Sequence, residues 1–470
     1  MNYNNIKNKI KNKYNNSFDI KFNDFNNIHL IYIDSLCDSN KINNTILKNI
    51  LLNKDFKSIK EIITNSNTIE IKNINDIYNY LDNGFCIVTY NNTALAVETK
   101  KNLSRAISEP TIEQTINGPK DSLNEDYMTN IGLIRKRIKD ESLTMIEKNV
   151  GKKTKTKVNI MYLDNIVENS LVNEIIKKID NLDLDYVLDS SFISQSIISS
   201  NNVFPLAETS ERPDLICMSL LEGKVCLLIE NSPFAIIIPT FFIDLFHSPE
   251  DYYQSVKNVT FTRIIRLLAF YIAIILPAFY IAITTFNHET IPLTLIINFA
   301  AQRNGVPFPT FIEALGMIII FELLRESDLR MPSVSGNAIS ILGAIVLGDA
   351  AVSAGIVSPI MVIIIAISSI CSLMFSNIAM VNAIRLWKII FLIFASFLGI
   401  VGLVFASFLF IIIISSLKSF GKPYLYPIAP YGNTKIKDSF IIPSIKNLKQ
   451  DPILTKDKVI KWKKPYYYLS

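Results

Sequence analysis

Residues 321–359 read FELLRESDLRMPSVSGNAISILGAIVLGDAAVSAGIVSP, an apolar stretch with a charged cluster at its start and Asp349 inside it. Small residues occur throughout it, and such residues let helices approach closely inside a bilayer. A carboxylate is costly there unless it faces protein or water. A segment that only anchors a protein needs neither feature, so the stretch predicts membrane helices with a working role.

The composition divides the chain of 470 residues into two regions. Hydrophobic residues make up 49% of the whole, yet the first 200 residues are rich in Asn, Lys, Asp and Ile. A soluble N-terminal α/β region is therefore expected before an α-helical membrane region that crosses the bilayer several times. The net charge of +5 is weak evidence about partners and does not imply nucleic acid.

Cysteine and histidine usage favours a reducing compartment without a metal centre. The five cysteines are dispersed and form no CxxC pair, and none of the three histidines lies near another candidate ligand. The N-terminus lacks an apolar segment of signal-peptide length, so the soluble region is expected on the cytoplasmic side. No P-loop, GxGxxG or GxSxG motif occurs. Their absence argues against a nucleotide cofactor and against a catalytic serine.

The soluble region is expected to contain two small subdomains. Residues 1–17 are polar and lysine-rich, which predicts a flexible arm. Residues 131–157 hold nine Lys or Arg against three acidic residues, and we interpret 105–157 as a basic connector or exposed helix. Apolar periodicity predicts α/β subdomains over 18–104 and 158–246, with a hairpin at 85–99, strands at 215–220 and 225–229, and a second hairpin turning at 230–233.

The membrane region is expected over 247–417. Two weaker segments lie between its clear spans and are interpreted as re-entrant or cavity-lining helices. The tail, 418–470, contains the run KVIKWKKP and is expected to be cytoplasmic. If the soluble region and the tail both lie on the cytoplasmic side, the chain must cross the membrane an even number of times. Four crossings satisfy that condition. The spans are expected at 264–286, 334–356, 357–375 and 389–414, and the weaker segments at 291–301 and 310–324.

Ordered motifs along most of the chain resemble the A subunit of bacterial spore germinant receptors, the GerA family. The resemblance covers about residues 18–430, and no single motif would carry it. The motifs are EPTIEQTINGP (109–119), NIGLIRKRI (130–138), VGKKTKTKVNIMYLDNI (150–166), ETSERPD (208–214), LLEGKVCLLIENSPFAIIIP (220–239), SPEDYY (248–253) and NGVPFPTFIEALGMIIIFELLRESDLRMP (304–332).

The resemblance implies a non-catalytic, multi-pass receptor subunit of the spore inner membrane. Such a subunit looks like the part that forms a homo-oligomer and conducts monovalent cations when a nutrient binds. The implied partners are a nutrient-sensing membrane B subunit and a lipoprotein C subunit, and no cofactor is implied. A divergent accessory germination protein of the same family stays open, as do a secondary transporter-like permease and a scaffold that conducts nothing.

Five charged residues are candidates for a pore or its gate: Glu313, Glu322, Arg325, Glu326 and Asp349. Helical spacing lets Arg325 pair with Glu322, with Glu326 outside that pair. Carboxylates at the rim of a path raise the local cation concentration, whereas the alternative is an interfacial helix end with a structural ion pair. Asp349 is expected to line water or meet a cation, and the alternative is a hydrogen-bonded cap at a helix break.

Other motifs favour structural roles. Gly336, Gly343, Gly348 and Gly355 are expected to be packing positions between helices or subunits. The basic residues 135–137, with Lys139, are expected to form a solvated face or a contact with an acidic surface rather than bind nucleic acid. Residues 210–214, SERPD, place a serine beside two carboxylates without a base to activate it, so we interpret them as a loop of paired charges.

Overall fold

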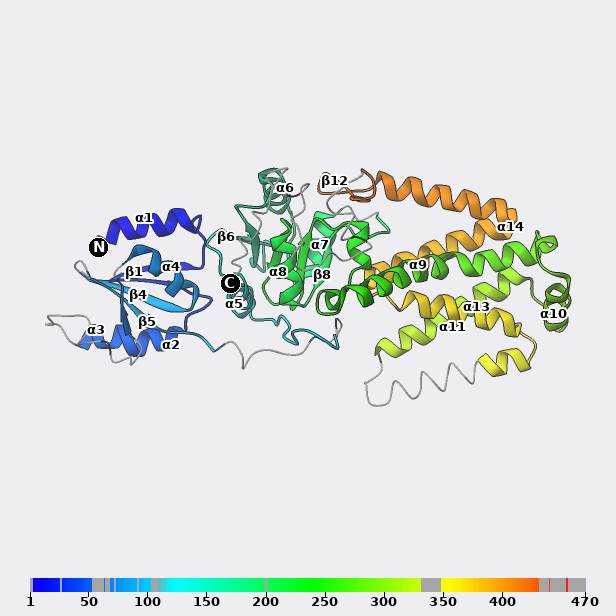
Figure 1. Cartoon of the computed structure of the whole chain (residues 1–470), viewed down its shortest axis with the longest axis horizontal. Helices are drawn as coiled ribbons and strands as arrows, with labels where there is room; N and C mark the ends of the chain where they lie inside the picture. Colours follow the sequence, from blue (N-terminus) through cyan, green and yellow to red (C-terminus); the bar gives the residue numbers. More distant parts are fainter. Residues whose placement is uncertain are drawn as a thin grey trace, which may run out of the picture.

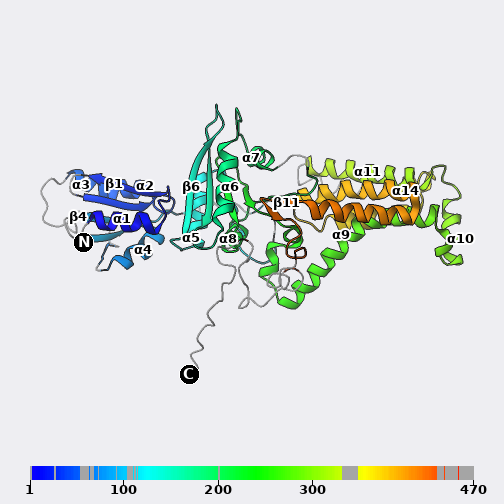
Figure 2. The same cartoon turned by 90° about the horizontal axis from the view of Figure 1, so that it is seen from above.

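The computed structural model describes residues 3–25, 28–52, 63, 68–71, 73–90, 93–102, 110, 113, 115–198, 202–330, 348–430, 439 and 454. Two sheet subdomains and a helical region follow one another along the long axis of the molecule (Figure 1). The second subdomain lies between the first and the helices in both views (Figure 2). The two-part organisation expected from composition, α/β followed by α-helical, is therefore present.

The first subdomain is a five-stranded antiparallel sheet with helices on both faces. Its strand order is β1-β2-β4-β5-β3, and the predicted hairpin pairs Phe85 with Glu98 through Tyr90 with Thr93. Leu30 and Ile31 are adjacent and both buried, because the sheet is covered on each side. The elements are α1 (Tyr3–Lys13), β1 (Ile20–Phe25), β2 (Ile28–Ile33), α2 (Ser39–Ile42), α3 (Lys48–Leu52), β3 (Thr68–Glu70), α4 (Ile74–Asp82), β4 (Phe85–Tyr90) and β5 (Thr93–Glu98).

The expectation of a flexible arm at residues 1–17 is wrong. Residues 3–13 form α1, which buries Ile6 and Ile10 in the core of the first subdomain, and Tyr14 is fully buried just after it. These three residues are spaced by four, so they form one apolar stripe on an otherwise polar helix. The lysine-rich composition concealed that stripe.

The second subdomain is another five-stranded antiparallel sheet, with strand order β6-β7-β9-β10-β8. Helices α5 and α8 pack on one face, and α6 and α7 pack on the other. The predicted second hairpin is confirmed as β9 and β10. The elements are α5 (Tyr127–Arg137), β6 (Leu143–Val150), β7 (Thr156–Leu163), α6 (Asn169–Asp180), α7 (Ser190–Ile197), β8 (Glu208–Ser210), α8 (Pro213–Leu221), β9 (Val225–Ile229) and β10 (Ala235–Ile238).

Two expectations about this subdomain are corrected. Residues 127–150 belong to its fold, because α5 is largely buried and β6 pairs with β7 along its whole length, so 105–157 is not simply a connector. Residues 215–220 form part of α8 and not a strand. Pro213 at the first helical position starts that helix, and Ile216 and Leu220 lie one turn apart on its buried side.

A buried ion pair joins the two subdomains. Arg135 of α5 is 1% exposed, and its guanidinium contacts both carboxylate oxygens of Asp19 at 3.0 Å. Ser17 and Ser35 donate further hydrogen bonds to Asp19, at 2.8 and 3.1 Å. The expectation of a solvated basic face therefore fails for Arg135, which meets an acidic partner inside the protein.

The helical region extends away from the second subdomain, with α10 at the far end (Figure 1). Two helices, α9 and α14, are long and apolar enough to cross a membrane among the residues described. The chain then returns to the second subdomain, where the backbone N–H of Phe242 donates to the carbonyl of Tyr424 at 2.9 Å. The elements are α9 (Val256–Thr285), α10 (Leu293–Arg303), α11 (Thr310–Arg330), α13 (Pro359–Ser372), α14 (Ile378–Ser416), β11 (Lys418–Ser419) and β12 (Lys422–Pro423).

Helix α14 reverses direction at Gly399, so the expectation of one span at 389–414 is wrong. Gly399 has φ 60° and ψ −137°, which is not helical. The rings of Trp387 and Phe410 lie 4.9 Å apart, whereas a straight helix would separate these positions by about 35 Å. The two arms of α14 fold against each other (Figure 1). A Cβ on Gly402 would lie 2.0 Å from the carbonyl oxygen of Phe394, so this turn also needs glycine there.

The remaining expected spans have mixed outcomes. The segment 264–286 lies almost wholly within α9. Most of 334–356 lies outside the described residues, and 357–375 holds α13, which has 14 residues. Helix α11 continues to Arg330 and has 21 residues, six more than the segment 310–324 expected from sequence.

Candidate functional site

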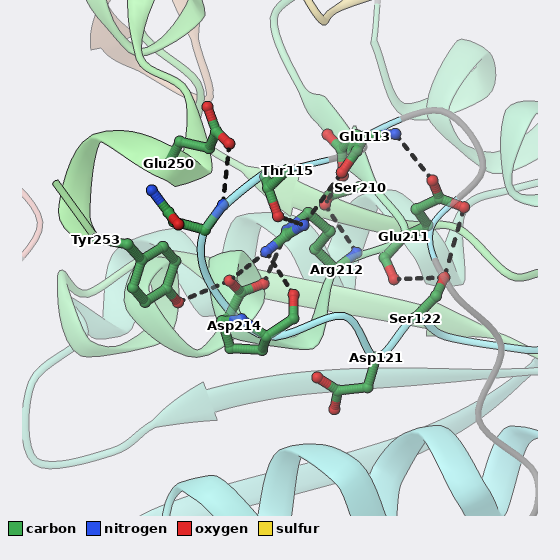
Figure 3. Close-up of polar contacts among 12 residues, drawn as sticks. Glu113, Thr115, Asp121, Ser122, Ser210, Glu211, Arg212, Asp214, Glu250 and Tyr253 are labelled. Atoms are coloured by element: carbon green, nitrogen blue, oxygen red, sulfur yellow. Dashed lines mark hydrogen bonds and ion pairs between the residues drawn. The ribbon is translucent and has the colours of Figure 1, made fainter. Parts of the chain in front are cut away.

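A polar junction joins the second subdomain to the start of α9, and Figure 3 shows its contacts. One component is a segment without helix or strand, residues 113 and 115–123, which we name the strap. It crosses the start of α8, where β8 ends and Arg212 caps the helix. The strap contains part of the motif EPTIEQTINGP (109–119), and β8 with the start of α8 contains ETSERPD (208–214). These motifs are about 90 residues apart along the chain and are in contact in the fold.

Arg212 is the centre of the junction. Its side chain is fully buried, and Nε and Nη2 donate to the two carboxylate oxygens of Asp214 at 3.1 and 2.8 Å. The same guanidinium donates to the strap: to the carbonyls of Glu113 (3.1 Å) and Pro119 (3.0 Å) and to Oγ1 of Thr115 (2.8 Å). A planar group with five N–H donors suits such a divergent set of acceptors. The segment SERPD is thus a loop of paired charges, as interpreted from sequence, and its arginine also donates hydrogen bonds to the strap.

A second set of contacts fixes the strap from the side of the helical region. The 3₁₀ helix η5 (Pro249–Tyr252) supplies Glu250, whose carboxylate accepts the backbone N–H groups of Ile116 and Asn117. Tyr253 donates its hydroxyl to Asp214 at 2.7 Å. Gly118 has φ 119°, and a Cβ there would lie 2.7 Å from the Tyr253 ring, so only glycine lets the strap pass this close.

Carboxylates near the strap have perturbed acidities. Glu113 accepts the hydroxyl of Ser210 at 2.5 Å, and burial, with the neighbouring Glu211, raises the pKa of Glu113 to about 7. A small cavity of about 40 Å³ adjoins it, lined among others by Glu208, Lys224 and Asp244. Lys224 contacts Asp244 at 2.7 Å, and burial raises the pKa of Glu208 to about 8. The junction therefore contains two carboxyl groups that titrate near neutral pH.

Helix η5 also binds α9, the first long helix. Asp251 accepts from Nε of Arg263 at 3.0 Å and from both terminal nitrogens of Arg266 at 2.9 and 2.5 Å. Burial would raise the pKa of Asp251, but the two guanidinium groups lower it below its ordinary value. Neighbouring residues of one short helix, Glu250 and Asp251, thus contact the strap and α9 respectively. The strap and α9 are therefore linked through two adjacent residues.

The candidate pore residues lie apart from this junction. Glu313 is 2% exposed, and one of its oxygens accepts the backbone N–H of Ser358 at 2.6 Å and that residue's hydroxyl, which satisfies the start of α13. Glu322 pairs with Arg325 at 2.9 Å, as predicted, and also with Arg385 of α14 at 3.0 Å. Glu313 and Glu322 both belong to α11 and are separated by nine residues along it.

The other candidates are more exposed or lie outside the described residues. Glu326 and Asp349 are exposed, and Asp349 lies in a helical segment at 348–353. Among the described residues, none forms an ion pair with Asp349. A Cβ on Gly355 would lie 3.1 Å from the carbonyl oxygen of Gly305, and one on Gly348 would lie 3.9 Å from Val362. Gly336 and Gly343 lie outside the described residues.

Sequence reasoning missed several residues that the structure brings into these clusters. Glu250, Asp251 and Tyr253 lie in the quoted SPEDYY motif, but nothing in its spacing indicates the strap or α9 as partners. Arg385 and Lys388 were the clearest missed signal, because two basic residues stand inside an apolar run. Lys388 is 5% exposed, whereas the side chain of Arg385 is 33% exposed.

Comparison with known proteins agrees with the motifs. The model of the family described as Bacillus/Clostridium GerA spore germination protein matches residues 8–454. Spore germination protein KA of Bacillus subtilis is 35% identical over 435 residues, covering 90% of this chain and 80% of that protein.

Two further similarities concern a second relative and a solved structure. Spore germination protein GerQA of Bacillus cereus is 34% identical, covering 92% of this chain and 88% of that protein. The crystal structure of the N-terminal domain of the A subunit of the Bacillus megaterium spore germinant receptor GerK3 is 26% identical, with a TM-score of 0.39, covering 50% of this chain and 94% of that one. From the family match and these two relatives, this chain belongs to the GerA family of spore germination proteins.

Proposed function

We propose that the chain is the A-type membrane subunit of a spore germinant receptor, and that copies of it assemble around an ion-conducting path that opens when a germinant binds. Membership of the GerA family and the names of the two relatives support the role in germination. The proposed location is the spore inner membrane, with B and C receptor subunits as partners. No catalytic step is part of the proposal.

The observation that carries the conducting role is the set of ionisable side chains within the apolar helices. Glu313 is almost fully buried in α11, and Lys388 is 5% exposed in α14. Glu322 lies between Arg325 and Arg385 at the contact of the same two helices. Charged groups inside membrane helices are expensive and are typical of ion or proton pathways and gates. A purely anchoring bundle would not need them.

The proposed topology is multi-pass with both ends on one side. Helix α9 leaves the second subdomain, and the chain returns there after α14, where the backbone N–H of Thr240 donates to Ser419 at 3.3 Å. A path that starts and ends at the same subdomain implies an even number of passes. If each arm of α14 crosses, the reversal at Gly399 raises the four passes expected from sequence to five, so an even total requires one further pass, for which the 21-residue α11 is long enough. The lysine-rich tail favours the cytoplasmic side for this end.

The polar junction is the proposed link between receptor and path. Germinant binding, mainly at the B subunit, would favour one position of the strap, and Glu250 and Asp251 would transmit it to α9. Such a ligand opens the path only if it binds the open arrangement more tightly than the closed one.

The test is ion flux through purified subunits in liposomes. The chain is reconstituted with its B and C partners, and germinant-dependent release of a trapped monovalent cation is measured. Gated release is expected, and Glu322→Gln should change its rate, whereas Lys152→Gln, at an exposed ion pair with Asp183, should not. Nutrient uptake without ion current would instead indicate a transporter. Neither activity, from a correctly assembled complex, would indicate a scaffold.

A further inference from the structure

A buried polar cluster lies where α9, α10, α11 and α13 meet, near α10 at the far end of the helical region (Figure 1). Tyr280 of α9 and Glu313 of α11 are 3% and 2% exposed. One carboxylate oxygen of Glu313, Oε1, accepts the hydrogen bonds of Ser358 at the start of α13. The rings of Tyr280 and Phe299 lie 6.1 Å apart, and Arg303 follows Phe299 by about one turn on the same side of α10. Four helices thus bring a phenol, a carboxylate and a guanidinium together.

Three atoms of this cluster have no hydrogen-bond partner among the residues described. They are Oε2 of Glu313, the hydroxyl oxygen of Tyr280 and Nε of Arg303, and all three are shielded from bulk solvent. Ser358 also lies near the Tyr280 hydroxyl, but its own hydroxyl donates to Glu313. A buried polar atom without a partner destabilises a fold, so such atoms are usually paired. Three of them in one cluster indicate a shared partner that is not part of the chain.

The mixture of donors and acceptors restricts what this partner is. An ionised carboxylate only accepts hydrogen bonds, a guanidinium only donates them, and a phenol does both. A metal cation cannot accept the N–H of Arg303, and an anion is repelled by Glu313. Water both donates and accepts, and a buried water in a protein makes about three hydrogen bonds. The three unpaired atoms therefore match a water molecule.

Water has access to the cluster from the far end of the helical region. Residues 304–309, which join α10 to α11, are mostly exposed. They lie beside the segment that precedes α13, because a Cβ on Gly355 would lie 3.1 Å from the carbonyl oxygen of Gly305. Irregular backbone among membrane helices is tolerated where it is buried in protein or faces water. Glu313, in the first turn of α11, and Ser358, just before α13, lie directly after these two irregular segments.

We propose that Glu313, Tyr280 and Arg303 hold an internal water molecule that links α9, α10 and α11 to the start of α13. The water donates to Oε2 of Glu313, accepts from Nε of Arg303 and shares a hydrogen bond with the hydroxyl of Tyr280. Glu313 thereby uses one oxygen for Ser358 and the other for the water. The site holds four helices together, and it does so whether or not the assembly conducts ions.

The test is radiolytic labelling of the full chain in detergent, followed by mass spectrometry. Short X-ray pulses convert water into hydroxyl radicals, which oxidise side chains beside a bound water even where bulk solvent is excluded. Tyr280 should be oxidised several-fold faster than Tyr424, a matched control that is fully buried and donates to the carbonyl of Pro205 at 2.9 Å. Equally slow oxidation of the two tyrosines would overturn the proposal.

The variant Tyr280→Phe distinguishes a hydrated site from a dry one by the sign of its effect. Loss of a hydrogen bond to water should lower the melting temperature by roughly 1–3 °C, whereas removal of an unpaired buried hydroxyl would leave it unchanged or raise it. An unchanged or higher melting temperature therefore counts against the water.

A bound cation is tested separately, by melting the full chain in sodium, potassium or choline chloride at equal ionic strength. The three melting temperatures should agree, because the proposed ligand is uncharged. Stabilisation by sodium or potassium alone, lost in Glu313→Gln, would identify a cation in the site and overturn the assignment.

Discussion

The second sheet subdomain and the helical region both contain buried charges, but they neutralise them differently. In the subdomain, Arg212 directs its N–H groups at a carboxylate and at three groups of the strap. In the helices, the single carboxylate of Glu322 is shared between two cations, Arg325 and Arg385. Fully satisfied buried polar networks rigidify a fold and specify a single arrangement. The comparison contrasts a network whose central cation is fully paired with one in which two cations share a carboxylate.

The largest effect is expected from breaking the rigid part. Replacing Arg212 with Met leaves Asp214 buried beside it and the strap carbonyls without donors, which should cost about 3–5 kcal/mol of unfolding free energy. Hydrogen exchange measured by mass spectrometry should accelerate in the strap and α8 and remain slow in α14. Lys152→Ala, at a pair whose side chains are 64% and 78% exposed, is the control and should change little. Equal acceleration in both regions would contradict the division drawn above.

A smaller effect, confined to the helices, is expected from Gly399→Ala. Its positive φ costs a side chain about 1–2 kcal/mol, and the added Cβ would lie 2.8 Å from Cβ of Phe286, so the total should be about 2 kcal/mol or more. Thermal unfolding followed by Trp387 fluorescence, in a Trp462→Phe background, should shift to lower temperature. Gly316→Ala is the matched control, since nothing lies within 4 Å of its added Cβ. If both variants unfold alike, the reversal does not depend on Gly399.

The junction should also make the stability of the protein depend on pH. Folding raises the pKa of Glu113 to about 7 and that of Glu208 to about 8, from ordinary values of 4.5. The folded state therefore binds more protons, and its stability falls as pH rises from about 4.5 to about 8. Melting temperature measured between pH 5 and 8 should decline, and Glu208→Gln should flatten that decline. A melting temperature that rises over this range, or a slope unaffected by the substitution, would count against the assignment.

Much of the local structure could be predicted from local pattern. The hairpins of both sheets follow from alternating residues around short polar turns, and α9 follows from an apolar run of sufficient length. Failures arose where composition outweighed periodicity. The prediction of an arm at 1–17 is wrong because lysine and asparagine hide three apolar residues spaced by four. The prediction of a strand at 215–220 is wrong because apolar runs this short fit either structure.

In the candidate site, contacts between neighbours on one helix could be predicted from sequence, but contacts between distant residues could not. The pair of Glu322 and Arg325 was predictable because i and i+3 positions are neighbours on any helix. The contacts of Arg212 with Thr115 and Pro119, and of Asp251 with Arg266, join residues whose proximity depends on the folded chain. The reversal of α14 was likewise hidden, because glycine is frequent in membrane helices and does not by itself mark a reversal.

By itself, the sequence determined the division into an α/β part and an apolar helical part, the family and the presence of charges within the helices. These properties depend on composition, periodicity and ordered motifs, which survive without coordinates. Only the tertiary structure decided which charge meets which: Arg212 with the strap, Asp251 with α9, and Glu322 with Arg385 but not Lys388. Long-range pairing depends on how elements pack, and the strength of a buried charge depends on the partners and solvent that this packing leaves to it.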